Sequence, residues 1–197
     1  MPRPTRRRAA TNPRAGPSSP APVPLTRPPD PGTLGRVIRP AEPRDVEAIH
    51  QFIVDLAVYE REPDAVTATA SALDRALFGQ NPALFADVAE VDGRVVGMAI
   101  WFLNYSTWDG CHGIYLEDLY VDPAHRGSGL GRDLLVTLAR RCVERGYSRF
   151  QWWVLDWNEP SIDFYKAMGA VAMDEWTVYR TSGEALEAMA ALPLRSA

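Results

Sequence analysis

Hydrophobic positions follow two different periods along this chain, and the pattern changes from one to the other several times. The first clear run recurs every three or four residues, which is the period of a helix with one buried face. It consists of Val46, Ile49, Phe52, Ile53 and Leu56. Because Pro43 suits the first turn of a helix, the run predicts a helix over residues 43–59. Residues 70–78 carry a weaker pattern of the same kind.

Runs of β-branched and aromatic residues predict the strands. Residues 84–91 and 94–102 are two such runs, and Asp92-Gly93 between them is a strong signal for a tight hairpin turn. Further strands are expected at residues 37–39, 114–121, 149–155 and 176–179. Further helices are expected at residues 129–145, 158–169 and 184–191. This alternation of strand and helix patterns predicts an α/β (α+β) domain.

The first 36 residues differ in composition from the rest of the chain. They are dominated by Pro, Arg, Ala and Ser, and they cannot bury enough apolar surface to offset the entropy of ordering. They contain seven arginines and one aspartate, a charge of +6, which leaves −10 for the remainder of a chain whose net charge is −4. We predict a disordered extension over residues 1–36 and one folded domain over residues 37–197.

Composition also limits the classes of partner. An acidic domain attracts cationic ligands and repels nucleic acid, so we expect no nucleic-acid contact except through the basic residues 6–8, which otherwise form a solvated tail. No apolar run approaches the roughly 20 residues of a membrane span. The two cysteines, Cys111 and Cys142, and the three histidines show no metal-ligand spacing. We expect a soluble cytoplasmic protein without a metal.

A glycine-rich loop separates the predicted strand at 114–121 from the predicted helix at 129–145. It reads Arg126, Gly127, Ser128, Gly129, Leu130, Gly131 and Arg132. Glycines allow close approach of backbone N–H groups to an anion, and a following helix adds partial positive charge, so a phosphate is the expected ligand. The Lys-Ser/Thr of a Walker loop is missing, and Arg132 stands where a dinucleotide loop has its third glycine. The loop resembles the acetyl-CoA pyrophosphate loop of the GNAT superfamily.

Glu117 and Asp118 are adjacent carboxylates in an otherwise apolar strand. Successive strand residues point to opposite faces, so both reach one pocket only where a bulge interrupts the strand. A carboxylate there can accept the proton of an attacking amine, and an ion pair with an arginine is the alternative. Tyr165, in the helix that follows Asn158, can protonate a departing thiolate, whereas a core position is the alternative.

The likeness becomes closer in the block from Trp157 to Lys166, which reads Trp-Asn-Glu-Pro-Ser-Ile-Asp-Phe-Tyr-Lys. Together with Tyr-Leu-Glu-Asp at 115–118, it resembles the spermidine/spermine N-acetyltransferases and their thialysine-acetylating relatives. The resemblance implies a GNAT fold with a mixed sheet of six or seven strands flanked by about four helices. It also implies a homodimer.

The resemblance further implies roles for individual residues. Glu117 would be the base and Tyr165 the acid. Acetyl-CoA would contact the backbone of Leu119, Tyr120 and Val121, the loop from Arg126 to Arg132, and Asn158, Ser161, Tyr165 and Lys166. The amine would lie among Tyr59, Glu60, Trp108, Glu117, Asp118 and Trp176, where carboxylates and aromatic faces attract an ammonium group.

These observations predict an acetyl-CoA-dependent N-acetyltransferase for a small cationic amine. Two alternatives remain open: a protein or peptide lysine acetyltransferase, and an acetyl-CoA-binding sensor without turnover. The sequence does not choose among spermidine, thialysine, shorter diamines and an amino-acid side chain.

Overall fold

The structure is a computed structural model that describes residues 35–195. The chain divides into two units, Met1–Thr33 and Leu34–Ala197, and the description concerns the second. The extension predicted over residues 1–36, with its basic residues 6–8, therefore lies outside the described residues except for its last two. One of these two, Arg36, is the first residue of a strand.

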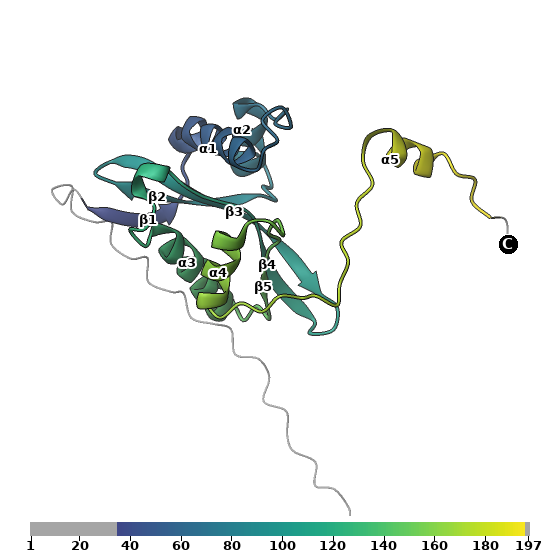
Figure 1. The fold of residues 1–197 in the computed structure, drawn as a ribbon. Coiled ribbons are helices and arrows are strands. Elements are labelled where there is room, and N and C mark those ends of the chain that lie inside the picture. The colour runs from purple at the N-terminus through teal and green to yellow at the C-terminus, as the bar shows by residue number, and fades with distance from the viewer. Residues whose placement is uncertain (1–34, 196–197) are drawn as a thin grey trace, which may run out of the picture. The chain divides into compact units, whose positions relative to one another are not determined.

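Five strands form one mixed sheet in the order β1-β2-β3-β4-β5 (Figure 1). Their bounds are β1 Arg36–Pro40, β2 Phe85–Val91, β3 Arg94–Ser106, β4 Cys111–Val121 and β5 Phe150–Gln151. The first four strands pair antiparallel, and β5 pairs parallel with β4. The predicted mixed α/β sheet is confirmed, with five strands among residues 35–195 in place of six or seven.

Helices cover both faces of the sheet (Figure 1). On one face, α1 (Val46–Tyr59) and α2 (Ala70–Phe78) pack on a core that includes Ile49, Val88 and Met98. On the other, α3 (Leu130–Arg145) and α4 (Glu159–Ala167) pack on a second core. That core includes Leu134, Leu138, Ile114 and Leu116. Short 3-10 turns precede α1 (Pro43–Asp45) and α3 (Pro123–His125), and α5 (Gly183–Ala190) comes last.

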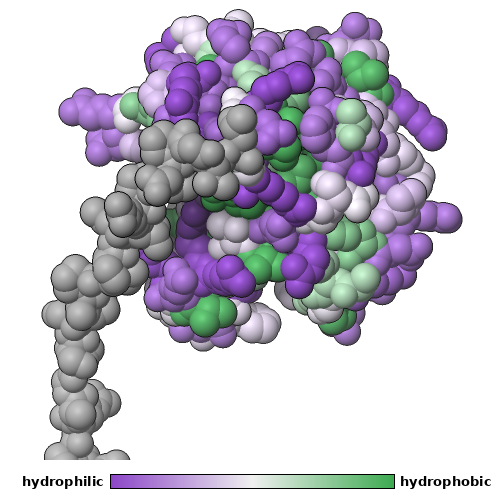
Figure 2. Space-filling model, turned by 90° about the vertical axis from the view of Figure 1, so that its left-hand side faces the viewer, coloured by the Kyte–Doolittle hydropathy of each residue, from purple (hydrophilic) through white to green (hydrophobic). Residues whose placement is uncertain are grey.

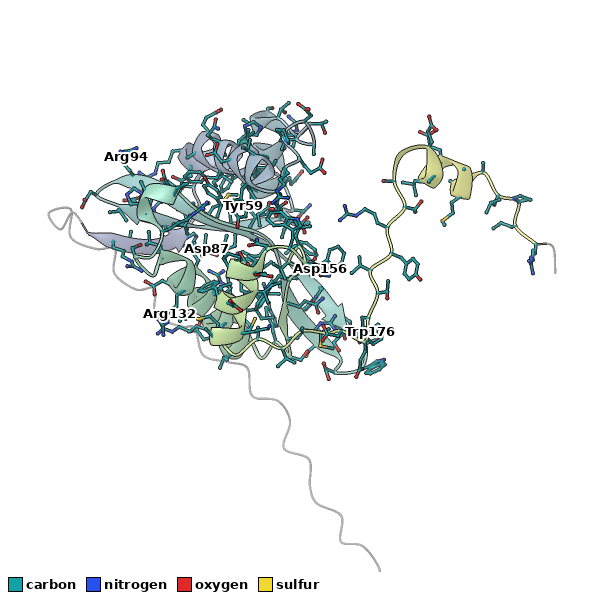
Figure 3. The ribbon with its side chains drawn as sticks, in the orientation of Figure 1. Tyr59, Asp87, Arg94, Arg132, Asp156 and Trp176 are labelled. Atoms are coloured by element: carbon teal, nitrogen blue, oxygen red, sulfur yellow. The ribbon has the colours of Figure 1, made fainter. Side chains whose placement is uncertain are left out.

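A buried ion pair fixes α3 against the sheet. The Asp87 carboxylate on β2 is 1% exposed and accepts two hydrogen bonds from the Arg141 guanidinium of α3, at 2.6 and 2.8 Å (Figure 3). It also accepts a hydrogen bond from the Trp101 indole on β3 at 2.8 Å. Because every oxygen of this buried carboxylate is paired, the network joins two strands and one helix without leaving a charge unsatisfied.

Short-range signals predicted the ends of several elements. Asp92 and Gly93 both have positive φ, +49° and +78°, as a two-residue hairpin turn requires. Gly146 ends α3 in the left-handed region at φ +68°, and the Asn158 side chain accepts from the Ser161 N–H to cap α4. These predictions are confirmed.

Two predicted strands differ in the structure. The strand expected over residues 149–155 is limited to Phe150–Gln151, because the chain turns away from β4 after that point. The strand expected over residues 176–179 was wrong: these residues pair with no strand in the described part of the chain, and the Trp176 N–H bonds only to the Met173 carbonyl in a turn. Without a neighbouring backbone, a β-prone run forms no ladder.

Candidate functional site

The site begins where two strands separate. β4 and β5 pair only at Ile114 with Phe150 and Tyr115 with Gln151. Beyond this point residues 116–121 and residues 152–155 line opposite parts of a cavity of about 650 Å³. The backbone of β4 is thus paired with β3 on one side and open to the cavity on the other. The two strands therefore splay apart where the cavity begins. On the face drawn in Figure 2, mostly hydrophilic residues surround a hollow that holds hydrophobic ones.

A bulge brings two adjacent carboxylates to the cavity. In the pairing of β3 with β4, Ile100 faces Asp118 and the next residue, Trp101, faces Leu116, so Glu117 is the extra residue. Both Glu117 and Asp118 line the cavity, although alternation along a regular strand would have sent them to opposite faces. The bulge inferred from the sequence is therefore present.

The glycine loop forms one end of the cavity. Gly127 and Gly129 have φ of +72° and +87°, a region that disfavours any residue with a Cβ, and Gly129 is the N-cap of α3. Gly127, Gly129 and Gly131 all line the cavity. Since the first N–H groups of a helix have no partner within the helix, this end of α3 offers donors to an anion. A pyrophosphate fits this combination of glycine backbone, helix N-terminus and the side chains of Arg126 and Arg132.

The carboxylates in the cavity have an unusual electrostatic environment. Burial, with the charges of Glu117 and Glu60 nearby, raises the pKa of Asp118 to about 6. Burial also raises the pKa of Glu60. Three acidic groups that line one cavity make it favourable for a positively charged ligand, which would relieve their mutual repulsion.

Tyr165 lies on α4 and lines the same cavity. Its ring packs on Trp152, with 5.0 Å between the ring centroids. Burial, followed by the charges of Glu60 and Tyr59, raises the pKa of Tyr165 to about 12. The phenol therefore holds its proton at neutral pH and is able to donate it.

The end of α1 is joined to the start of α4 beside the cavity. The Tyr59 hydroxyl donates to Asn158 Oδ1 at 3.0 Å, and the same oxygen accepts from the Ser161 N–H at 3.4 Å (Figure 3). Asn158 is 7% exposed, so its side chain is satisfied where it is buried. The Arg61 guanidinium lies 4.5 Å from the centre of the Trp157 ring, which adds a second contact between the same two segments.

Most of the residues predicted for the site meet at this cavity. Those that line it are Tyr59, Glu60, Glu117, Asp118, Leu119, Tyr120, Val121, Arg126, Gly127, Gly129, Leu130, Gly131, Arg132, Asn158, Ser161 and Tyr165. Four others do not: Ser128, Lys166, Trp108 and Trp176. Trp108 lies in the turn between β3 and β4 and is 91% exposed, and Trp176 is 68% exposed.

Sequence reasoning missed nine residues of the cavity wall: Leu56, Leu116, His125, Trp152, Trp153, Val154, Leu155, Pro160 and Phe164. Leu56 comes from α1, and Trp152 and Trp153 come from the segment after β5. The ring of Trp153 stands edge-on to Tyr115 of β4, with 5.7 Å between the centroids. The helical period already marked Leu56 as inward-facing. The two tryptophans had no such signal, because their position depends on where β5 leaves β4.

Two classes of feature are absent from residues 35–195. No group of three or more His, Cys, Asp or Glu residues is placed to hold a metal ion. No helix in this range is long and apolar enough to cross a membrane.

Comparison with known proteins identifies the family. Residues 46–170 match the model of the acetyltransferase (GNAT) family. The chain is 37% identical over 165 residues to thialysine N-epsilon-acetyltransferase of Sus scrofa, an alignment that covers 78% of this chain and 96% of the relative. It is 31% identical over 221 residues to L-ornithine N5-acetyltransferase NATA1 of Arabidopsis thaliana, covering 88% and 97%.

Solved structures share the fold. An integron cassette protein from the mobile metagenome of V. cholerae superimposes with a TM-score of 0.69 at 22% identity, covering 81% of this chain and all of that one. The splayed sheet and the glycine loop before α3 suit an anionic ligand, and the family match gives the class of reaction, which is acetyl transfer. The chain belongs to the acetyltransferase (GNAT) family and is an N-acetyltransferase.

Proposed function

We propose that this chain transfers an acetyl group from acetyl-CoA to the amine of a small cationic substrate. The proposal is carried by one arrangement: Glu117, Asp118 and Tyr165 line the same cavity as the glycine loop. A proton acceptor, a proton donor and an anion-binding loop are the three groups that acetyl transfer from a thioester to an ammonium ion requires.

The residues at the cavity fit acetyl-CoA. Gly127 and Gly129 have positive φ beside the N-terminus of α3, and the Cβ position of Gly127 has no atom within 4 Å, which suits the pyrophosphate. The open edge of β4 at Leu119 and Tyr120 suits the amides of the pantetheine arm, as an added strand would. Asn158 and Ser161 at the start of α4 complete this set. When bound, acetyl-CoA supplies the acetyl group in activated form, as a thioester.

Two side chains carry the proton transfers in this proposal. Glu117 accepts the proton of the substrate ammonium, directly or through water, and its exposed position lets that proton pass to solvent. The neutral nitrogen bonds to the acetyl carbonyl carbon, and as the C–S bond breaks Tyr165 gives its proton to the departing sulfur, for which a phenol held protonated in the cavity is suited. The second proton that the nitrogen loses returns to the phenolate of Tyr165. Asp118 and Glu60 hold the positive charge of the substrate.

The acidic wall supports a cationic amine as the acceptor. The names of the relatives also support a cationic amine, since thialysine and ornithine both carry a side-chain amine. Polyamines and diamines belong to the same chemical class. We assign Tyr59 to the substrate side of the cavity. Trp108 and Trp176 do not line the cavity, so we propose them as substrate contacts only in an assembled form of the protein.

We also propose a homodimer. Large apolar side chains are exposed in the segment that follows α4, and a second copy would cover them. They are Val171, Met173, Trp176, Val178, Tyr179, Leu186 and Met189. Exposed apolar area of this extent is typical of an interaction surface. Light scattering coupled to size-exclusion chromatography tests it. A mass of twice the chain supports the dimer, and a monomer at micromolar concentration contradicts it.

The cytoplasm is the proposed location. Cys111 and Cys142 are both free, and unpaired thiols suit a reducing compartment. Fractionation of cells that express the full chain tests this assignment, and recovery of the protein from an oxidising compartment would contradict it.

A substrate panel tests the proposed function. Thiol release from acetyl-CoA is measured with polyamines, diamines, thialysine, ornithine, other amino acids and lysine peptides. Activity on one or a few small cationic amines supports the proposal. Activity on lysine peptides alone supports a protein acetyltransferase, and tight acetyl-CoA binding with no thiol release for any amine supports a sensor.

A further inference from the structure

Arg36 contacts the glycine loop from a distant part of the chain. It is the first residue of β1, and 92 residues separate it from Ser128. Its guanidinium donates through Nη1 to the backbone carbonyl of Ser128, and Nη2 lies 2.5 Å from Asp133 Oδ2 in the first turn of α3. Arg36 therefore holds both the loop and the helix that follows it.

The contact with Ser128 fixes the direction of a peptide plane. The Ser128 carbonyl and the Gly129 N–H belong to one peptide unit, and the described residues contain no cis peptide bond. In a trans peptide these two groups point in opposite directions. With its carbonyl held by Arg36, the unit turns the Gly129 N–H to the other side of the loop. Gly129 lines the cavity and Ser128 does not, which agrees with this orientation.

The flexibility of the loop makes such a clamp useful. Gly127 and Gly129 flank Ser128, and glycines allow a peptide unit to rotate between several conformations at little cost. The Gly129 N–H has no acceptor among residues 35–195, so nothing else in the described chain fixes it. A donor that is already oriented binds an anion without a further loss of entropy.

The charge of Arg36 supports the same interpretation. A cation at the N-terminus of a helix is normally unfavourable, because it lies next to the positive end of the helix dipole. Asp133 offsets this repulsion through its ion pair with Arg36. A bound pyrophosphate would offset it further, so the arrangement is most favourable when an anion occupies the loop.

We propose that Arg36 is a positioning residue for the pyrophosphate of the acyl donor: it locks the Ser128–Gly129 peptide with the Gly129 N–H toward the cavity. This inference rests on the proposed function, since it assumes that the loop receives acetyl-CoA. Arg36 does not line the cavity, so it acts through the loop and not by contact with the reacting atoms.

Two variants and a matched control test the proposal. Arg36→Met removes the guanidinium and keeps an unbranched apolar stem about as long as that of arginine. Arg36→Lys keeps the charge as a single ammonium without the planar fork. Arg94→Met removes the same charge from an exposed arginine at the β2–β3 hairpin, away from the cavity-lining residues (Figure 3). Calorimetric titration gives the dissociation constant of CoA, and kinetics compare acetyl-CoA with S-acetylpantetheine, which has no pyrophosphate.

The expected result is selective for the donor that carries a pyrophosphate. Arg36→Met weakens CoA binding roughly tenfold, which is the effect of losing one charge-assisted hydrogen bond, here the bond from the Gly129 N–H to the pyrophosphate. Its kcat/KM falls for acetyl-CoA and stays unchanged for S-acetylpantetheine. Arg36→Lys recovers only part of the loss, because a point charge fixes the peptide plane less well. Arg94→Met binds CoA like the unaltered protein.

Three outcomes would overturn the inference. Unchanged CoA affinity in Arg36→Met removes the role, and an equal loss with S-acetylpantetheine means a general distortion of the fold. Full recovery in Arg36→Lys, with an equal loss in Arg94→Met, means that overall charge accounts for the effect. Failure of the proposed function looks different: the unaltered protein itself would not bind CoA.

Discussion

Tyr59 and Asn158 are 99 residues apart in the chain, and a hydrogen bond of 3.0 Å joins them at the edge of the cavity. The family resemblance implies that Tyr59 contacts the amine and Asn158 the cofactor. Because the two residues are in direct contact, the end of α1 on the substrate side of the cavity is hydrogen-bonded to the N-cap of α4, the helix that carries Tyr165. Under the proposed function, this contact would couple the binding of one substrate to that of the other.

Removal of this hydrogen bond should be mild and specific. In Tyr59→Phe, Asn158 still caps α4 through Ser161, so the fold persists and about 1 kcal/mol of interaction is lost. We expect the dissociation constant of CoA and the KM of the amine both to rise, by about two- to fivefold. Steady-state kinetics and calorimetry measure them. Tyr147→Phe, outside the cavity-lining set, is the control and should change neither. If both the dissociation constant of CoA and the KM of the amine are unchanged in Tyr59→Phe, the hydrogen bond does not couple the two sides of the site.

Tyr165→Phe should affect turnover far more than binding. The variant keeps the ring that packs on Trp152 and loses only the proton that the phenol donates. General acid catalysis contributes about 10²- to 10⁴-fold, so kcat should fall within that range while the dissociation constant of CoA changes less than about twofold. Pre-steady-state kinetics and calorimetry separate the two quantities. A variant with normal kcat would remove Tyr165 from the acid role.

The pH dependence of stability should report the environment of Asp118. Its pKa in the folded chain, about 6, lies above the ordinary value of 3.8, so folding favours the neutral acid. The stabilisation is complete below about pH 4 and is lost as the pH rises through 6, by up to about 3 kcal/mol. Asp118→Asn should therefore raise Tm at pH 8 and leave it unchanged near pH 3.5.

The control for this measurement is Asp74→Asn, which alters an exposed carboxylate on α2. It should leave Tm unchanged at both pH values. If Asp118→Asn lowers Tm at pH 8, then the charged carboxylate is stabilised in the fold, contrary to the acidic cavity described above.

Substitution of the two glycines at the ends of α3 distinguishes a loss of CoA binding from the cost of a strained backbone. Gly129 and Gly146 both adopt positive φ, +87° and +68°, and a methyl group at either costs about 1 kcal/mol of stability. A methyl group at Gly129 would also lie 3.3 Å from Arg36 Nη2, so this flexible side chain has to shift, whereas one at Gly146 meets no atom within 4 Å. Gly129→Ala should also weaken CoA binding about tenfold or more, whereas Gly146→Ala should not, because only Gly129 lines the cavity. Thermal unfolding and calorimetry make the comparison. Equal CoA affinity in the two variants would mean that the loop does not hold the pyrophosphate.

Local signals explain which features could be predicted. The Asp92-Gly93 turn, the Asn158 cap and the Gly146 stop each depend on a few neighbouring residues, so the sequence contains their cause. The bulge at Glu117 was also within reach, since two carboxylates inside an apolar strand are difficult to place otherwise.

Features that depend on distant partners could not be predicted. Trp152 and Trp153 lie in a β-prone run, yet β5 ends before them because β4 diverges at that point. The contact of Arg36 with Ser128 and the pairing of Asp87 with Arg141 cross 92 and 54 residues. Residues 176–179 are the opposite case: their local propensity favours a strand, but the described part of the chain holds no neighbouring strand for them to pair with.

Direct detection of the acetylated product tests the central claim. The full chain is incubated with isotopically labelled acetyl-CoA and the amine that the substrate panel selects, and the amine is analysed by mass spectrometry over a range of pH. We expect one labelled acetyl group on the amine, and in Glu117→Gln a rate profile shifted to higher pH, because more of the amine must then arrive already neutral. No labelled amine at any pH, despite tight acetyl-CoA binding, would contradict the account.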